Sequence, residues 1–179
     1  MAATLTLRLT APRSAETPQQ RLERLYESSR EDVYAYVASV LRDHSVAEDV
    51  TALVFERAFR RRRLFDPRRG TERAWLFGIA RNAALDELRR RKRIAPSAAE
   101  QPQDAEAGRE QFEGVLRRTT VVGAIAALPP RERELIALKF HAGLSNSEIA
   151  RVLGVSESNA GTLLHRTITK LRKACDEQD

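Results

Sequence analysis

Residues 74–93 read AWLFGIARNAALDELRRRKR, and our interpretation of the chain starts from this stretch. Leucine, isoleucine and alanine recur in it at near-helical spacing, which predicts a helix with one buried face. The other face, spaced by three or four residues, carries Trp75, Gly78, Asn82, Asp86 and Arg89. An aromatic ring can stack on an unpaired base, an amide can read a base edge, and arginines can hold phosphates. Taken alone, the stretch also fits an amphipathic helix whose charged end is solvated.

Charge is distributed unevenly along the 179 residues, whose formal net charge is +6. Residues 57–93 contain 14 Lys and Arg against 4 Asp and Glu, residues 94–115 contain 1 against 5, and residues 139–175 contain 6 against 2. An excess of positive charge indicates a polyanionic partner, most simply nucleic acid. The alternation predicts two DNA-facing modules and an acidic connector.

Cysteine and histidine content argues against several kinds of site. Cys175 is the single cysteine, so neither an internal disulfide nor a cysteine-based metal site is expected, and a reducing cytoplasm fits. His44, His141 and His165 are scattered without ligand spacing, so we expect no metal and no cofactor. No apolar run is long enough for a membrane span, and membrane insertion is not expected.

The hydrophobic pattern divides the chain into four parts. Residues 1–21 are predicted to be a flexible leader, and residues 94–117 an Ala-, Pro- and acid-rich linker. Residues 22–93 and 118–175 carry helical patterns, and no strand is needed in either. The predicted fold class is therefore all α, with two small helical domains joined by a flexible acidic linker.

Local signals indicate where the helices of the first domain begin. A first helix is expected over about residues 22–42, and a second over about 46–62. Ser45 and Glu48 have the spacing of a capping box for the second helix. Thr71 follows a basic loop and is the expected cap of the helix that contains Trp75.

The C-terminal domain ends in a pattern typical of a helix-turn-helix. Ser145 and Glu148 form a capping box before a short helix, and Gly154 marks a tight turn before the last helix. The outer side of that turn and helix presents small, polar or basic residues suited to base edges and phosphates: Ser156, Ser158, Asn159, Thr162, His165, Arg166 and Lys170. DNA binding is therefore favoured over an ordinary helical hairpin.

Several short stretches then occur in a characteristic order. They are AEDV at 47–50, FERA at 55–58, AWLFGIARN at 74–82, DELRR at 86–90, LPPRERE at 128–134, GLS at 143–145, EIA at 148–150, LGVS at 153–156 and LHR at 164–166. In this order, with a linker between, the chain resembles the extracytoplasmic-function group of bacterial sigma factors in the sigma-70 family. The resemblance covers about residues 22–175.

This resemblance implies a dissociable, non-catalytic promoter-specificity subunit of RNA polymerase. The first domain would recognise and melt the −10 promoter element, and the helix-turn-helix would read the −35 element. The implied partners are core RNA polymerase, through its β and β′ subunits, promoter DNA, and an anti-sigma factor.

The resemblance also assigns roles to residues. Docking on core polymerase would involve Asp49, Val50, Leu53, Phe55, Glu56 and Phe59. Phe55 and Phe59 lie off the apolar stripe of their helix, which fits either second-layer packing or such a docking surface. Contacts with the −10 element would come from Arg68, Arg69, Trp75, Arg81, Asn82, Asp86, Arg89, Arg90 and Arg93, with Asn82 near a flipped base. Contacts with the −35 element would come from the polar residues of the turn and last helix named above.

One place departs from the family pattern. Many relatives carry a Lys and an Arg on the recognition helix where this chain has Gly161 and Leu163. A glycine inside a helix costs about 1 kcal/mol relative to alanine. The departure predicts an unusual −35 element or weaker binding to it.

Two other functions fit parts of the sequence. A helix-turn-helix regulator could act without polymerase, but the first domain shows no ligand-pocket signature and no phosphoacceptor strand. A DNA enzyme such as a recombinase can carry the same motif, but we find no carboxylate cluster for metals and no activated nucleophile.

Overall fold

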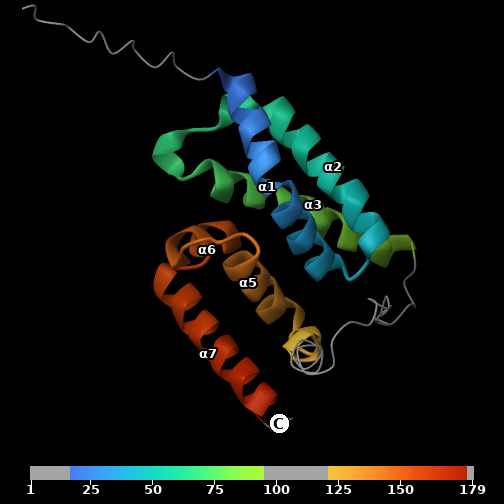
Figure 1. Ribbon diagram of the computed structural model, residues 1–179, viewed down its shortest axis with the longest axis vertical. Helices are drawn as coiled ribbons and strands as arrows, with labels where there is room; N and C mark the ends of the chain where they lie inside the picture. The colour runs from blue at the N-terminus through green and yellow to red at the C-terminus, as the bar shows by residue number, and fades with distance from the viewer. Residues whose placement is uncertain (1–16, 95–120, 177–179) are drawn as a thin grey trace, which may run out of the picture.

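Helices make up all the regular structure in residues 17–94 and 121–176, the parts of the chain that the computed structural model describes (Figure 1). This agrees with the all-α prediction. The elements are α1 (Pro18–Leu41), α2 (His44–Arg61), η1 (Arg62–Leu64), η2 (Pro67–Arg69), α3 (Glu72–Ile94), α5 (Pro130–Phe140), α6 (Asn146–Leu153) and α7 (Glu157–Asp176). Residues 121–126 are also helical. Most of the predicted leader and linker lies outside the described residues.

The first helix begins at Pro18, four residues earlier than the apolar pattern predicts. Thr17 caps it: the Gln20 amide donates to the Thr17 hydroxyl at 3.2 Å, and the Thr17 amide donates to the Gln20 side chain at 3.0 Å. This is a capping box, with a proline in the first turn where a missing N–H costs nothing. Capping chemistry therefore extends the helix beyond its buried stripe.

The predicted cap of α2 was wrong. The capping residue is Asp43, whose Oδ1 accepts from the Val46 amide at 3.0 Å, and not Ser45. The other carboxylate oxygen of Asp43 accepts from Arg91 of α3 at 2.9 Å. One side chain thus starts α2 and ties it to α3.

We expect Asp43→Ala to lower the free energy of unfolding by about 1–2 kcal/mol, chiefly because the first turn of α2 loses its cap. Ser45→Ala removes a hydroxyl at the same helix end and is the matched control, with an expected change within about 0.5 kcal/mol. Chemical denaturation followed by circular dichroism measures both. Equal losses in the two variants would contradict the assignment of the cap.

Helices α1, α2 and α3 pack against one another as the first module (Figure 1). Tyr36, Leu76 and Phe77 are among its largest fully buried side chains. The rings of Tyr36 and Phe77 meet edge to face, with centroids 5.5 Å apart. This aromatic contact joins α1 to α3 at the centre of the module.

The second module comprises residues 121–176. Pro130 occupies the first turn of α5, where a missing N–H costs nothing. The buried Arg133 side chain donates to the carbonyl of Ala126 at 3.1 Å, which joins the preceding segment to α5. Gly154 ends α6 with φ of +69°, a left-handed conformation that favours glycine. The predicted capping box of Ser145 and Glu148 is confirmed.

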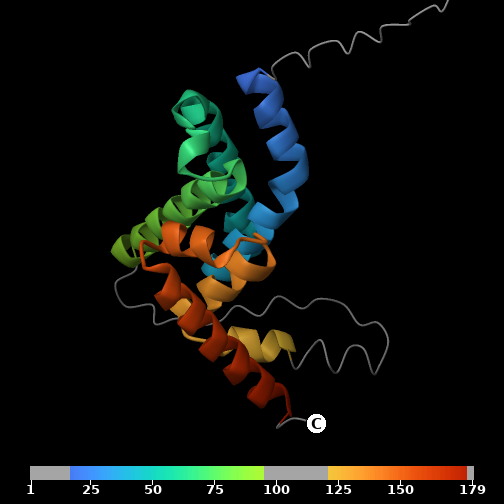
Figure 2. The same cartoon turned by 90° about the vertical axis from the view of Figure 1, so that its left-hand side faces the viewer.

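The two modules lie side by side (Figure 2), and their buried side chains belong to one hydrophobic core. Helix α1 contacts α5, and α3 contacts α6. Among the apolar residues of the segment before α5, Ile125 and Leu128 pack in this core, whereas Val121 and Val122 are exposed. The sequence predicted two domains and a linker, and the structure adds that their faces meet.

Candidate nucleic-acid interface

Helix α3 places the predicted aromatic and amide side chains outside the core. Its start is the one predicted, since the Thr71 hydroxyl accepts from the Ala74 amide at 3.2 Å. Leu76 and Phe77 then point inward and are fully buried. Trp75 and Gly78 are half-buried and Asn82 is exposed; together we call these three residues the α3 face.

A cavity of about 540 Å³ opens beside the α3 face. The rings of Trp75 and Phe65, with centroids 5.7 Å apart, form part of its wall. A Cβ added at Gly78 would meet no heavy atom within 4 Å, so this glycine leaves open space. Flat aromatic walls, open space and the Asn82 amide together suit an unstacked base.

Exposed arginines precede and follow the α3 face along the chain. Arg68 and Arg69 are exposed on η2, and Arg89, Arg90 and Arg93 are exposed at the end of α3. Arg90 donates to Glu87 at 2.7 Å, and this hydrogen bond lowers the pKa of the Glu87 carboxyl.

Asp86, also predicted at the −10 surface, is exposed but paired. It accepts from Arg57 of α2 at 3.1 Å and from Arg89 at 3.4 Å. Its carboxylate therefore holds Arg89 near the end of α3, beside the other exposed arginines.

Arg81 lies in a different environment from its neighbour Asn82. It donates to Glu134 of α5 at 2.8 Å, and the two side chains are only 25% and 12% exposed. The Tyr36 hydroxyl donates to the same carboxylate at 3.2 Å. Burial and the adjacent Glu134 raise the pKa of Tyr36 well above its ordinary value. Arg81, predicted to contact −10 DNA, is thus engaged within the protein.

The helix-turn-helix has the geometry that its caps and turn predict. The Ser156 hydroxyl accepts from the Asn159 amide at 3.2 Å, so this hydroxyl serves as a helix cap. Ala160, Leu164 and Thr167 form the buried stripe of α7. The predicted DNA-facing residues are all exposed on the opposite side: Ser156, Ser158, Asn159, Thr162, His165, Arg166 and Lys170. Lys170 also pairs with Glu132 at 3.1 Å.

The prediction of two missing positive charges on α7 needs correction at Leu163. Leu163 packs against the hydrophobic core, because it falls on the inner side of the helix. Gly161 is half-buried, and a Cβ there would lie 3.6 Å from the Asn146 side chain. Leu163 therefore does not mark a charge lost from a DNA-facing surface.

Comparisons with known proteins match two separate segments of the chain to family models. Residues 25–94 match the family model of sigma-70 region 2, and residues 119–171 match that of sigma-70 region 4. The ECF RNA polymerase sigma factor BldN of Streptomyces coelicolor is 32% identical over 154 residues, covering 84% of this chain and 58% of BldN. The chain belongs to the extracytoplasmic-function group of the sigma-70 family. It is a non-catalytic sigma factor that directs promoter recognition by RNA polymerase.

Other relatives are similar over most of their length. The ECF sigma factor SigL of Mycobacterium tuberculosis is 27% identical over 155 residues, covering 86% of this chain and 88% of SigL. RpoE of Bartonella quintana, solved in complex with the anti-sigma factor NepR, superposes with a TM-score of 0.72 at 20% identity, covering 88% of this sigma factor and 98% of RpoE. CnrH, solved with the cytosolic domain of CnrY, gives 0.65 at 24% identity, covering 90% and 91%. These two structures share the fold.

Two of the residues assigned to polymerase docking belong to the core of the sigma factor. Val50 is 5% exposed and Phe55 is 8% exposed. The Phe55 ring packs edge to face on Tyr26 of α1, with centroids 4.8 Å apart. The idea that Phe55 is an exposed docking residue was wrong, because α1 covers that side of α2.

The remaining docking candidates stay accessible. Phe59 is 46% exposed, and the Arg62 guanidinium lies over its ring at 4.1 Å. Asp49 and Glu56 are exposed, and Leu53 is half-buried. The accessible docking surface on α2 therefore consists of these four residues and is smaller than the sequence predicted.

Sequence reasoning missed three residues around the α3 face. Phe65 forms part of the cavity wall together with Trp75. The feature of the sequence that could have revealed Phe65 is an aromatic residue within a basic loop. Glu134 and Arg151 come from the second module. Glu134 forms an ion pair with Arg81, and Arg151 lies in the wall of the cavity. No local pattern reveals these two, since their partners lie far away in the chain.

The histidines lie apart from one another. His44 hydrogen-bonds with the Tyr34 hydroxyl at 2.9 Å, and His165 is exposed on α7. Burial lowers the pKa of His141, although nearby Asp32 opposes the shift. Within residues 17–94 and 121–176, no three His, Cys, Asp or Glu side chains are grouped to hold a metal ion. Over the same ranges, no helix combines the length and apolar character that crossing a membrane requires.

Proposed function

We propose that the α3 face holds an unstacked base of the −10 element during promoter opening. The observation that supports this most is the cavity in which Gly78 leaves open space between aromatic walls and the Asn82 amide. Energy gained by stacking the base offsets part of the cost of taking it out of the duplex. In this proposal, residues 22–93 form the −10-binding unit.

Phosphate contacts on either side would hold the DNA in register. The exposed arginines of η2 and of the end of α3 are placed to do so: Arg68, Arg69, Arg89, Arg90 and Arg93. Contacts to phosphates position a protein on DNA without reading its sequence. Asp86 would act indirectly, by orienting Arg89.

The −35 element would be read by the exposed side of α7, within residues 118–175. Ser158, Asn159 and Thr162 lie near the start of the helix, where they can approach base edges in a major groove. His165, Arg166 and Lys170 follow one and two turns later and suit phosphates. Ser156 would contribute through its cap of the helix.

Core polymerase would be bound through the exposed side of α2, by Asp49, Leu53, Glu56 and Phe59, on its β and β′ subunits. An exposed aromatic beside carboxylates fits a protein partner. We also propose regulation by an anti-sigma factor, as in the complexes of RpoE with NepR and of CnrH with CnrY. The site of action would be the cytoplasm.

Run-off transcription with core RNA polymerase tests the proposal as a whole. Addition of the chain should give promoter-dependent transcripts on genomic fragments of its source organism. Promoter binding should fall steeply with salt, because arginine contacts to phosphates release counterions. Failure to produce a transcript on any fragment, or to bind core polymerase in co-purification, would favour a regulator that acts without polymerase.

A further inference from the structure

The start of α1 lies before the segment that matches sigma-70 region 2. That match begins at residue 25, whereas the helix begins at Pro18 and is capped by Thr17. The residues before 25 add about two helical turns. Short helical segments gain most of their stability from tertiary contacts, so we expect these turns to have partners in the first module.

Arg21 and Arg24 connect these turns to the start of α3. Both arginines pair with the carboxylate of Glu72, Arg21 at 2.8 Å and Arg24 at 3.0 Å. Glu72 belongs to the first turn of α3, and its side chain is only 20% exposed. The shared carboxylate therefore joins α1 to the helix that carries the α3 face.

Arg21 also reaches the aromatic wall of the cavity of about 540 Å³ beside the α3 face, which we call the base cavity. Its Cζ lies over the Phe65 ring, 5.9 Å from the centroid, within the range of a cation–π interaction. The Phe65 ring in turn lies 5.7 Å from the Trp75 ring, centroid to centroid. Arg21, Phe65 and Trp75 thus form a continuous row from α1 to the α3 face.

Phe65 and Trp75 lie between α1 and the base cavity. Both rings line the base cavity, and both also line a small hollow to which α1 contributes Pro18, Arg21 and Leu22. This hollow measures about 20 Å³, room for a single water molecule. The two rings are therefore backed closely by α1 and face open space in the base cavity.

The position of Phe65 depends on its side-chain contacts. Phe65 lies between η1 and η2, outside the regular helices, and is half-buried. Trp75, by contrast, is part of α3. Segments with few buried contacts move more readily than packed helices. A guanidinium over the Phe65 ring therefore restricts the part of the cavity wall that the backbone constrains least.

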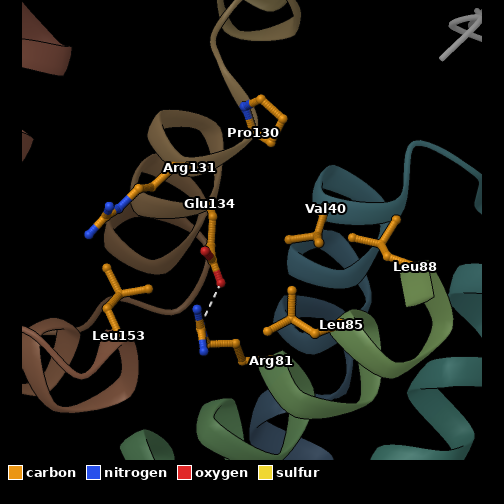
Figure 3. A pocket seen from close by; sticks show the side chains of 8 residues that line it. All are labelled: Val40, Arg81, Leu85, Leu88, Pro130, Arg131, Glu134 and Leu153. Carbon is orange, nitrogen blue, oxygen red and sulfur yellow. Dashed lines mark hydrogen bonds and ion pairs between the residues drawn. The ribbon is translucent and has the colours of Figure 1, made fainter. Parts of the chain in front are cut away.

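The second module supports α3 at a different place. Figure 3 shows Arg81 directed at Glu134 of α5, beside the apolar side chains of Val40 and Leu85, and the ion pair measures 2.8 Å. This contact fixes α3 about two turns after Trp75. It constrains the helix and not the Phe65 ring, which is held from α1.

We propose that Arg21 is a positioning residue for base capture. Held by Glu72, its guanidinium keeps the Phe65 ring beside Trp75 as the wall on which the unstacked base packs. Without Arg21, Phe65 would sample other positions, and part of the stacking energy would be lost. The inference rests on the proposed role of the α3 face, and it adds the first turns of α1 to that role.

Arg21→Ala removes the contact with Phe65, and Arg24→Ala is its matched control. The two variants lose the same kind of side chain, the same charge and an ion pair with the same carboxylate. Among the described residues, the guanidinium over Phe65 is that of Arg21. A difference between the variants therefore reports on Phe65 and not on net charge. Circular dichroism checks that both keep their helices.

Holoenzymes with each chain are compared for binding to a fluorescent non-template −10 oligonucleotide of a promoter that the holoenzyme transcribes. Arg21→Ala should weaken binding about fivefold, the upper end for an exposed cation–π contact. Arg24→Ala should stay within about twofold of wild type, since exposed ion pairs contribute little. In a Phe65→Ala background, Arg21→Ala should cause no further loss.

The same comparison is made with an oligonucleotide that lacks the base whose removal weakens wild-type binding most. Arg21→Ala and wild type should bind this abasic oligonucleotide equally, because no base remains to pack on the wall. An arginine that only contacted a phosphate, or only stabilised α1, would cause the same loss with and without the base.

The free chain gives a second readout, because Trp75 is the single tryptophan of the sequence. Acrylamide quenching of its fluorescence measures how accessible the indole ring is. Quenching should increase in Arg21→Ala, where Phe65 is no longer held beside Trp75, and should match wild type in Arg24→Ala.

The positioning role is overturned if Arg21→Ala and Arg24→Ala weaken binding equally, or if the loss in Arg21→Ala persists with the abasic oligonucleotide. Unchanged quenching in Arg21→Ala also overturns it, since the two rings would then keep their arrangement without Arg21. Failure of the proposed function is recognised separately. No abasic position would then weaken binding of the wild-type holoenzyme, whereas quenching would still report whether Arg21 orders the two rings.

Discussion

Asn82→Ala in the holoenzyme is expected to weaken promoter opening by about 1–3 kcal/mol, the size of a good amide contact to a base. The side-chain amide of Asn82 has no hydrogen-bond partner among the described residues and is exposed beside the cavity. Its removal should therefore disturb DNA contacts and leave the fold intact. Permanganate reactivity of unpaired thymines in the −10 region measures the loss.

Two comparisons make this result specific. Binding to core polymerase should be unchanged, because the docking candidates lie on α2. Asn159→Ala is the same substitution on α7, and it should weaken initial promoter binding without changing the rate of opening. Loss of core binding in Asn82→Ala would show that the α3 face had been assigned to the wrong partner.

Phe77→Ala is expected to have the largest effect on stability, lowering the free energy of unfolding by about 3–5 kcal/mol. Phe77 is fully buried, meets Tyr36 edge to face at 5.5 Å, and lies under the Arg73 guanidinium at 5.3 Å. Truncation would leave a cavity where α1 and α3 meet. Since most domains are stable by only about 5–15 kcal/mol, much of the native population would be lost on warming.

Phe140→Ala provides the control for Phe77. Phe140 is 65% exposed at the end of α5, so its removal should cost no more than about 0.5 kcal/mol. Urea denaturation of both variants, with equal transition slopes, gives the comparison. Similar losses in the two proteins would contradict the central position of Phe77 in the core.

Features set by neighbours in sequence could be predicted. Ser145 and Glu148 cap α6, Gly154 ends it and Thr71 caps α3, as their local spacing indicated. In each case the bonded groups lie within a few residues, so the pattern itself carries the information.

Features set by distant partners could not be predicted. Asp43 and Ser45 were both chemically able to cap α2, and Asp43 is additionally held by Arg91, 48 residues further on. Phe55 lay off the stripe of its own helix, but Tyr26 of α1 covers it. Helical periodicity shows which side of a helix is apolar, not which neighbours reach around it.

Dependence on distant partners also explains why some residues of the candidate site could not be predicted. The α3 face could be read from one helix, because Trp75, Gly78 and Asn82 repeat at helical spacing. The pairing of Arg81 with Glu134 joins residues 53 positions apart, across a linker. Nothing in either segment indicates which charged side chain of the other module it meets.

Abasic scanning of the −10 element tests the central claim most directly. Holoenzymes with wild-type and Asn82→Ala chains are compared for binding to a non-template oligonucleotide that lacks one base at a time. If the α3 face holds an unstacked base, one abasic position should weaken binding of the wild type and cause no further loss in Asn82→Ala. The account would be contradicted if, at every position, the loss of binding caused by the missing base added fully to the loss caused by Asn82→Ala. Asn82 and the captured base would then act independently.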